Sequence, residues 1–261
     1  MQTAAAHNLQ LADGVEPVHL AAYDRFMARA GGYGRAGFSV TIPNFGDGPL
    51  ESALQDVEPN LKLLGLLNVK YLASEFPMPW PDLTLETRIG NTYIYANERP
   101  LPRAWVAHQA VPIEADWLSQ LERLPDIATT ALIDPASATP LPAAGPGRPS
   151  AVHITHYSAD LIEMETAIDA AGWLILSEIW YPGWQATVNG TPVAVERVNG
   201  LLRGVYLAGP GEYNIRLVYR PRSVMWGNWI AGLSLSLVSL AGLGWIWFRS
   251  RRPSTGPHNC S

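Results

Sequence analysis

The sequence predicts an α+β protein with a mixed α/β N-terminal part, an antiparallel β-sandwich C-terminal part and one C-terminal transmembrane helix. Helical and strand patterns are mixed through residues 1–133. Residues 151–222 hold short apolar or alternating runs, separated by turn residues roughly every 8–12 positions, as in a sandwich. Residues 224–248 contain no Asp, Glu, Lys, Arg or His, which is typical of a membrane span.

The N-terminal part, residues 1–133, should contain both helices and strands. Apolar residues recur at helical spacing in residues 15–30, where Pro17 suits a first helical turn. Residues 92–97, TYIYAN, alternate as a strand should. The other expected elements are helices at 60–67 and 114–123 and strands at 68–74, 103–111 and 126–133.

Residues 134–150 should be a linker, because they are almost wholly Pro, Ala, Gly and Ser and cannot pack a core. The sandwich is expected to follow over residues 151–222. Asn189-Gly190 and Asn199-Gly200 are predicted hairpin turns, since both residue types tolerate positive φ. The expected strands are 151–158, 161–168, 173–180, 184–190, 192–198, 202–208 and 213–220.

Residues 223–248 are predicted to cross a membrane. The twenty-five uncharged residues 224–248 rise about 37 Å as a helix, enough for a hydrocarbon core of about 30 Å with some tilt. A buried core helix of a soluble domain is the alternative, and the length of the uncharged run favours the span. Residues 249–261 should then be a basic, disordered cytoplasmic tail. The expected membrane-interface anchors are Trp226, Trp229, Trp245, Trp247, Arg249, Arg251 and Arg252.

Composition limits the compartment and the partners. The net charge of −5 argues against a nucleic-acid partner. The one cysteine, Cys260, lies in the tail, so the region before the span has no disulfide, thiolate metal site or cysteine nucleophile. No signal peptide opens the sequence. Taken literally, this predicts a tail-anchored cytoplasmic protein; the alternative is that Met1 is internal to a longer membrane protein.

No catalytic, metal or cofactor site is expected from the residue patterns. His153 and His156 should lie on opposite faces of a strand, which is poor metal geometry, so we interpret them as ordinary strand residues. Glu163 and Glu165 share a strand face and could form an acid/base pair. A solvated strand face explains these two carboxylates more simply.

The most unusual local sequence is Ile-Trp-Tyr-Pro-Gly-Trp at 179–184. Trp180, Tyr181 and Trp184 are carbohydrate-contact candidates, because the C–H faces of a sugar ring pack on aromatic rings. The competing interpretation is that the two tryptophans fill the sandwich core around a Pro-Gly turn. Core filling is favoured, since a sandwich of this size needs bulky core residues.

Several stretches resemble the C-terminal extracytoplasmic region of YfhO-type bacterial membrane proteins, which are GT-C-like glycosyltransferase relatives. The most specific motifs are Leu-Pro-Arg-Ala (101–104) and Tyr-Pro-Gly-Trp (181–184), the latter followed by a Val-Asn-Gly turn. That family carries many upstream membrane helices and places its catalytic carboxylates in an early loop, so no catalytic residue transfers to this chain. The resembling stretches are residues 12–27, 60–74, 93–107 and 174–221, together with the closing helix.

The resemblance implies a topology and a role. The region before the span would be extracytoplasmic, with a single pass through the cell membrane. The chain would be a non-catalytic C-terminal piece of a polytopic protein involved in cell-surface sugar transfer from a polyprenyl-phosphate-linked donor. Its partners would be the bilayer, upstream helices of the same or a companion chain, and a cell-surface glycan or lipid-linked sugar. The alternative is a membrane-anchored carbohydrate-binding module without transferase activity.

Overall fold

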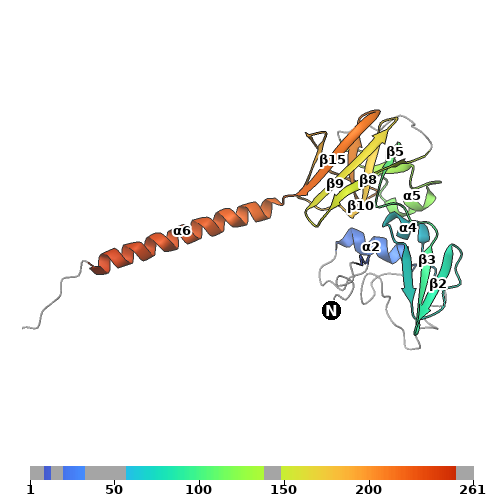
Figure 1. Ribbon diagram of the computed structural model, residues 1–261, viewed down its shortest axis with the longest axis horizontal. Coiled ribbons are helices and arrows are strands. Elements are labelled where there is room, and N and C mark those ends of the chain that lie inside the picture. The colour runs from blue at the N-terminus through green and yellow to red at the C-terminus, as the bar shows by residue number, and fades with distance from the viewer. Residues whose placement is uncertain (1–8, 13–19, 33–56, 138–147, 251–261) are drawn as a thin grey trace, which may run out of the picture.

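The computed structural model describes residues 9–12, 20–32, 57–137 and 148–250. Within the last helix, it describes the side chains at positions 223, 227, 229–243 and 245. The described part is α+β, with three sheets that are mostly antiparallel and few helices. One long helix projects from the body (Figure 1).

Three short helices cover one side of the body. Asn60 caps the second, because its side chain accepts a hydrogen bond from Leu63 N at 3.2 Å. Asp116 caps the third in the same way, through Ser119 N at 3.3 Å. The helices are α2 (Ala21–Ala30), α4 (Leu61–Leu66) and α5 (Trp117–Arg123). The predicted helix at 15–30 is confirmed for its second half; its first residues lie outside the described part of the chain.

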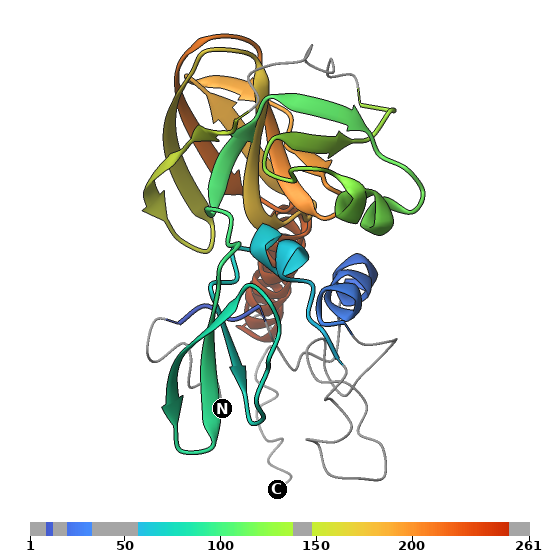
Figure 2. The ribbon, with the colours of Figure 1, turned by 90° about the vertical axis from the view of Figure 1, so that its right-hand side faces the viewer.

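A three-stranded sheet stands apart from the sandwich, with α4 close to the junction (Figure 2). Its order is β1-β3-β2, with all pairs antiparallel. β3 matches the predicted strand at 92–97. β2 was not expected from the sequence, and its residues are almost all exposed and interrupted by a bulge after Leu85. The strands are β1 (Tyr71–Ser74), β2 (Leu83–Ile89) and β3 (Thr92–Asn97).

The largest sheet has seven strands in the order β5-β6-β13-β14-β10-β4-β7, with only β5 and β6 parallel. Its strands come from both sides of residues 134–150, so the predicted linker does not separate one sheet from another. Local composition could not reveal this, because β4 and β10 are joined by long-range backbone pairing. The strands are β4 (Ala104–Ala107), β5 (Gln109–Pro112), β6 (Thr130–Ile133), β7 (Ser150–Ala151), β10 (Gly172–Ile179), β13 (Glu196–Val198) and β14 (Leu202–Leu207).

A five-stranded antiparallel sheet, β12-β11-β15-β9-β8, packs on this large sheet as the second layer of a sandwich. Trp173 and Ile175 of β10 face the helices, whereas Leu174 and Leu176 face the second layer. The large sheet is therefore buried on both sides, which explains its continuous apolar strands. The strands of the second layer are β8 (His153–Tyr157), β9 (Leu161–Ile168), β11 (Trp184–Val188), β12 (Thr191–Val193) and β15 (Gly211–Tyr219).

Both predicted hairpin turns are confirmed. Asn189 and Gly190 have φ of 49° and 80° between β11 and β12, and Asn199 and Gly200 have φ of 52° and 70° between β13 and β14. The prediction of a single strand at 192–198 is wrong. It divides into β12 and β13, which belong to different sheets.

The strand expected at 103–111 also divides, at His108. This fully buried ring lies 3.0 Å from the carbonyl oxygen of Ala171 and 2.8 Å from the hydroxyl of Ser150. β4 continues the sandwich before it, whereas β5 turns away to pair with β6. A buried polar ring with two partners thus marks the point where the chain changes neighbours.

α6 (Arg222–Ser250) follows β15 almost at once and extends away from the sheets (Figure 1). Across the described residues, no helix combines the length and the apolar character needed to cross a membrane. The described apolar side chains of α6 are exposed; Trp229 is 72% exposed and Leu235 70%.

Candidate functional site

The Trp180–Trp184 turn, which connects β10 to β11, lies against the start of α6. The backbone N–H of Arg220 donates to the carbonyl oxygen of Gly183 at 2.8 Å. Gly183 has φ of 114°, and a Cβ there would lie 3.0 Å from Pro221 Cα. Glycine is therefore required for this close approach. The aromatic run noted in the sequence therefore lies at the junction between the sandwich and α6.

The structure gives the three carbohydrate-contact candidates different surroundings. Trp180 is half-buried and donates from Nε1 to the carbonyl oxygen of Val195 at 3.2 Å. Trp184 packs against the sandwich core and lies 5.3 Å from the ring of Tyr219. Tyr181 is 49% exposed. Sugar stacking on these rings stays a prediction, and only Tyr181 offers a largely open face.

A charged cluster beneath the turn was not found from the sequence. Arg103 donates from its guanidinium to Glu178 Oε1 at 2.6 Å, and the hydroxyl of Tyr157 donates to the same oxygen. Arg203 approaches the other carboxylate oxygen at 3.8 Å. Arg103 lies in the Leu-Pro-Arg-Ala run and Glu178 lies just before the aromatic run. The motifs shared with YfhO-type proteins were therefore the signal that could have pointed to these residues. Nothing in the local sequence indicated that Arg103 and Glu178 contact each other.

Arg203 is the most buried charge of this cluster, with 9% of its side chain exposed. Its Nε donates to the carbonyl oxygen of Ile179 at 3.1 Å, and its guanidinium carbon lies 3.9 Å from the centroid of Trp184. The buried nitrogen NH1 has no hydrogen-bond partner among the described residues. Burial lowers the pKa of Arg203, and the nearby charge of Glu178 opposes that shift. Stacking on the indole supplies part of the stabilisation that water would otherwise give.

Tyr157 is held in its protonated form. Burial, followed by the hydrogen bond to Glu178, raises the pKa of Tyr157 to about 12. A tyrosine with such a pKa keeps its proton and donates a hydrogen bond to the carboxylate, and it does not act as a base near neutral pH. The cluster therefore positions the turn and leaves two arginines against one carboxylate, an excess of positive charge.

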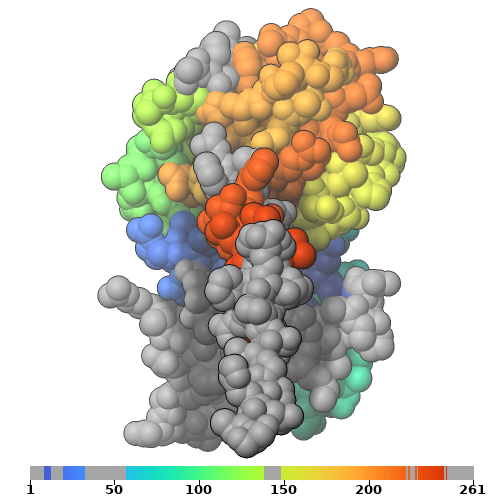
Figure 3. Space-filling view, turned by 90° about the vertical axis from the view of Figure 1, so that its left-hand side faces the viewer, coloured from blue at the N-terminus to red at the C-terminus, as the bar shows by residue number. Residues whose placement is uncertain are grey.

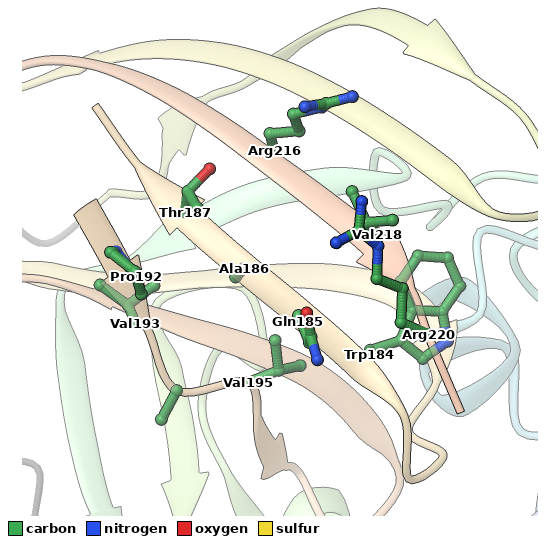
Figure 4. A pocket seen from close by; sticks show the side chains of 11 residues that line it. Trp184, Gln185, Ala186, Thr187, Pro192, Val193, Val195, Arg216, Val218 and Arg220 are labelled. Carbon is green, nitrogen blue, oxygen red and sulfur yellow. The ribbon is translucent and has the colours of Figure 1, made fainter. Parts of the chain in front are cut away.

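An open depression of about 400 Å³ lies over β11, β12 and β15 beside the turn (Figure 4). Arg216 and Arg220 border it. Arg216 pairs with Thr187 in the register of β11 and β15, so these two side chains lie on the same, outer face of the sheet. Its floor mixes polar and apolar groups, so it could hold a hydroxylated or anionic ligand. The main lining residues are Trp184, Gln185, Thr187, Pro192, Arg216 and Arg220.

The histidine prediction is corrected by a β-bulge. The register of β8 shifts between Ile154 and His156, so His153 pairs with Glu165 and His156 pairs with Glu163. Both histidines therefore share the outer face with the two glutamates instead of lying on opposite faces. Among the described residues, no group of three or more His, Cys, Asp or Glu side chains is placed to hold a metal.

The two glutamates lie on this outer sheet face. Glu163 lies 3.2 Å from Arg216, in a pair whose side chains are about half exposed, and Glu165 is exposed. A solvated strand face accounts for this arrangement.

The predicted interface anchors are described only in part. Trp229 and Trp245 are 72% and 62% exposed on α6. The side chains of Trp226, Trp247 and Arg249 are not among those described, and Arg251 and Arg252 lie outside the described residues.

Comparison with protein-family models, with curated proteins and with solved structures gives no match. The structure brings together the aromatic turn, the Arg103–Glu178 pair and the start of α6, all at one end of the sandwich.

Proposed function

We propose that this chain is a non-catalytic extracytoplasmic region, anchored in the cell membrane by α6, of a membrane protein involved in cell-surface sugar transfer. The supporting observation is the junction between sandwich and helix. β15 ends at Tyr219 and α6 begins at Arg222, so the helix leaves the sandwich without a spacer. Inserted α6 would therefore hold the sandwich close to the bilayer surface.

The exposed side chains of α6 support the membrane anchor. Leu233, Leu240 and Leu243 are each 65–66% exposed, and residues 224–248 carry no charged side chain. Each leucine gains about 1.5–3 kcal/mol on leaving water. Lipid around the helix would provide that burial, since an α-helix satisfies its own backbone polar groups.

The sugar-transfer part of the proposal rests on the resemblance to YfhO-type proteins. Arg103 and Glu178, from two of the resembling stretches, contact each other beside the start of α6. The two stretches therefore contact each other in this fold. The region would cover a membrane-embedded active site formed by upstream helices, of the same or a companion chain. It would shape the access of an acceptor or of a polyprenyl-phosphate-linked donor.

Labelling of an introduced cysteine tests the topology. Ser137→Cys in a Cys260→Ser background places one thiol before the predicted span. A membrane-impermeant maleimide added to intact cells should label it, and alkaline carbonate should leave the chain in the membrane. Labelling only after lysis would refute the extracytoplasmic placement and favour the tail-anchored cytoplasmic alternative. Glycosyl transfer by the purified chain alone would refute the non-catalytic role.

A membrane-anchored carbohydrate-binding module is the second candidate, and the depression beside Trp184 favours it. Gln185 and Thr187 face outward there, so Gln185→Ala and Thr187→Ala should weaken glycan binding without disturbing the core. Titration calorimetry with cell-wall glycans measures this. Binding that both variants leave unchanged would argue against the depression as the glycan site.

A further inference from the structure

We infer that the Trp180–Trp184 turn, with Arg197 and Arg220, is a second membrane contact that rests on an anionic lipid surface beside α6. This inference depends on the proposed anchoring by α6. The turn would then support the sandwich on the membrane surface instead of stacking against sugars. The ligand class is the headgroup layer of an anionic phospholipid bilayer.

The turn lies next to the residues that lead into α6. The turn touches the first residues that lead into α6, through the Arg220–Gly183 hydrogen bond and the contact of Gly183 with Pro221. Figure 3 looks along α6 toward the body, with the described atoms of α6, in red, in front of the sandwich. A bilayer crossed by α6 would therefore meet this end of the sandwich before the three-stranded sheet, which lies on the far side in Figure 1.

The exposed side chains of the turn suit a headgroup layer. Tyrosine and tryptophan are enriched where a protein meets the headgroup layer, because one part of each ring is apolar and another is polar. Tyr181 is 49% exposed, and Pro182 beside it is exposed. Neither is covered by the core, so both are free to enter the interface.

Cationic side chains flank the turn. Exposed Arg197 holds its guanidinium carbon 5.8 Å from the centroid of Trp180, and exposed Arg220 lies beside Trp184 in the depression. Glu178, two residues before the turn, is already engaged by two arginines. The turn thus presents aromatic rings flanked by cations, a combination that fits anionic headgroups better than a neutral glycan.

The contact would restrict the sandwich. One helix alone allows rotation and tilt of the body at the junction, whereas a second contact fixes one face toward the bilayer. The depression that opens beside Trp184 would then lie near the headgroup layer, where a lipid-borne ligand could reach it.

Site-specific fluorescence in nanodiscs tests this inference. The full chain carries Cys260→Ser and Tyr181→Cys, labelled with an environment-sensitive fluorophore, in discs of phosphatidylcholine alone or mixed equally with phosphatidylglycerol. Acrylamide is the quencher, because it is uncharged. The matched control is Tyr71→Cys in the same background, since Tyr71 is exposed on the three-stranded sheet. Near-ultraviolet circular dichroism checks that both variants keep the native fold.

We expect the label at position 181 to be protected from acrylamide in anionic discs and the label at position 71 to remain accessible. Arg197→Gln and Arg220→Gln should each weaken the protected state about fivefold, which corresponds to about 1 kcal/mol per arginine near an anionic surface. Equal quenching at the two positions in assembled discs would overturn the inference alone. Equal protection in neutral and anionic discs would overturn its electrostatic part, and failure of the chain to enter discs would overturn the anchoring proposal as well.

Discussion

Replacing Glu178 with glutamine should destabilise the protein far more than an ordinary surface substitution. The change keeps the shape of the side chain but removes the charge that faces both Arg103 and Arg203. Arg203 would keep its hydrogen bond to Ile179 and its stacking on Trp184. It would lose the only carboxylate that approaches it among the ion pairs of the described residues.

The exposure of the three charged side chains sets the size of the expected loss in the free energy of unfolding. Breaking a fully buried ion pair by removing one partner costs about 3–5 kcal/mol, whereas an exposed pair contributes about 0–1 kcal/mol. Glu178 and Arg103 are 21% and 26% exposed, and Arg203 is 9% exposed, so this cluster lies between the limits. We expect a loss of about 2 kcal/mol in the free energy of unfolding. For a body of this size, the thermal midpoint should fall by about 4–8 °C.

Urea denaturation followed by tryptophan fluorescence measures the change at neutral pH. The control is Glu114→Gln, which removes the carboxylate of the Arg123–Glu114 pair, where both side chains are more than half exposed. That variant should lose less than about 0.5 kcal/mol. If Glu178→Gln proves as stable as the control, the charge of Glu178 does not stabilise Arg103 and Arg203 and the cluster does not hold the turn in place.

Three further predictions concern other parts of the fold. Gly65→Ala should cost about 3 kcal/mol, because its Cβ would overlap a backbone carbonyl oxygen, whereas Gly209→Ala, with open space around it, should change little. The hydrogen bond from Arg29 lowers the pKa of Glu122, so this pair's stabilisation is present above the unfolded pKa of about 4.3 and is lost as pH falls through the folded pKa. Glu122→Gln should therefore lower the free energy of unfolding by about 0.5–1 kcal/mol at pH 7, and the variant should lose less stability than the unchanged protein as the pH falls. Equal urea midpoints for the two proteins at pH 7 would contradict this. Ultraviolet titration of the protein against Tyr157→Phe should assign a pKa of about 12 to Tyr157, and the Glu178→Gln variant should bring that pKa closer to 10.

Features governed by local chemistry could be predicted from the sequence. The two Asn-Gly hairpins follow from the few residue types that accept positive φ, and the alternation in residues 161–168 gave β9 with the predicted bounds. The uncharged run at 224–248 was predicted to be a transmembrane helix; α6 covers it as a helix, and the membrane crossing stays a prediction. In each case, the local structure is set by residues that lie close together in the sequence.

Features governed by distant partners could not be predicted. Arg103 and Glu178 are 75 residues apart, and only the pairing of β4 with β10 brings them into contact. The bulge that turns His153 and His156 to one face depends on the register against β9, which neither histidine encodes. The sequence by itself determined the two Asn-Gly turns, the strand β9 and the helix over the uncharged run, but not β2 or the division of the strands expected at 103–111 and 192–198. Tertiary structure alone decided which strands share a sheet and which charges meet, because both depend on how distant segments pack and exclude water.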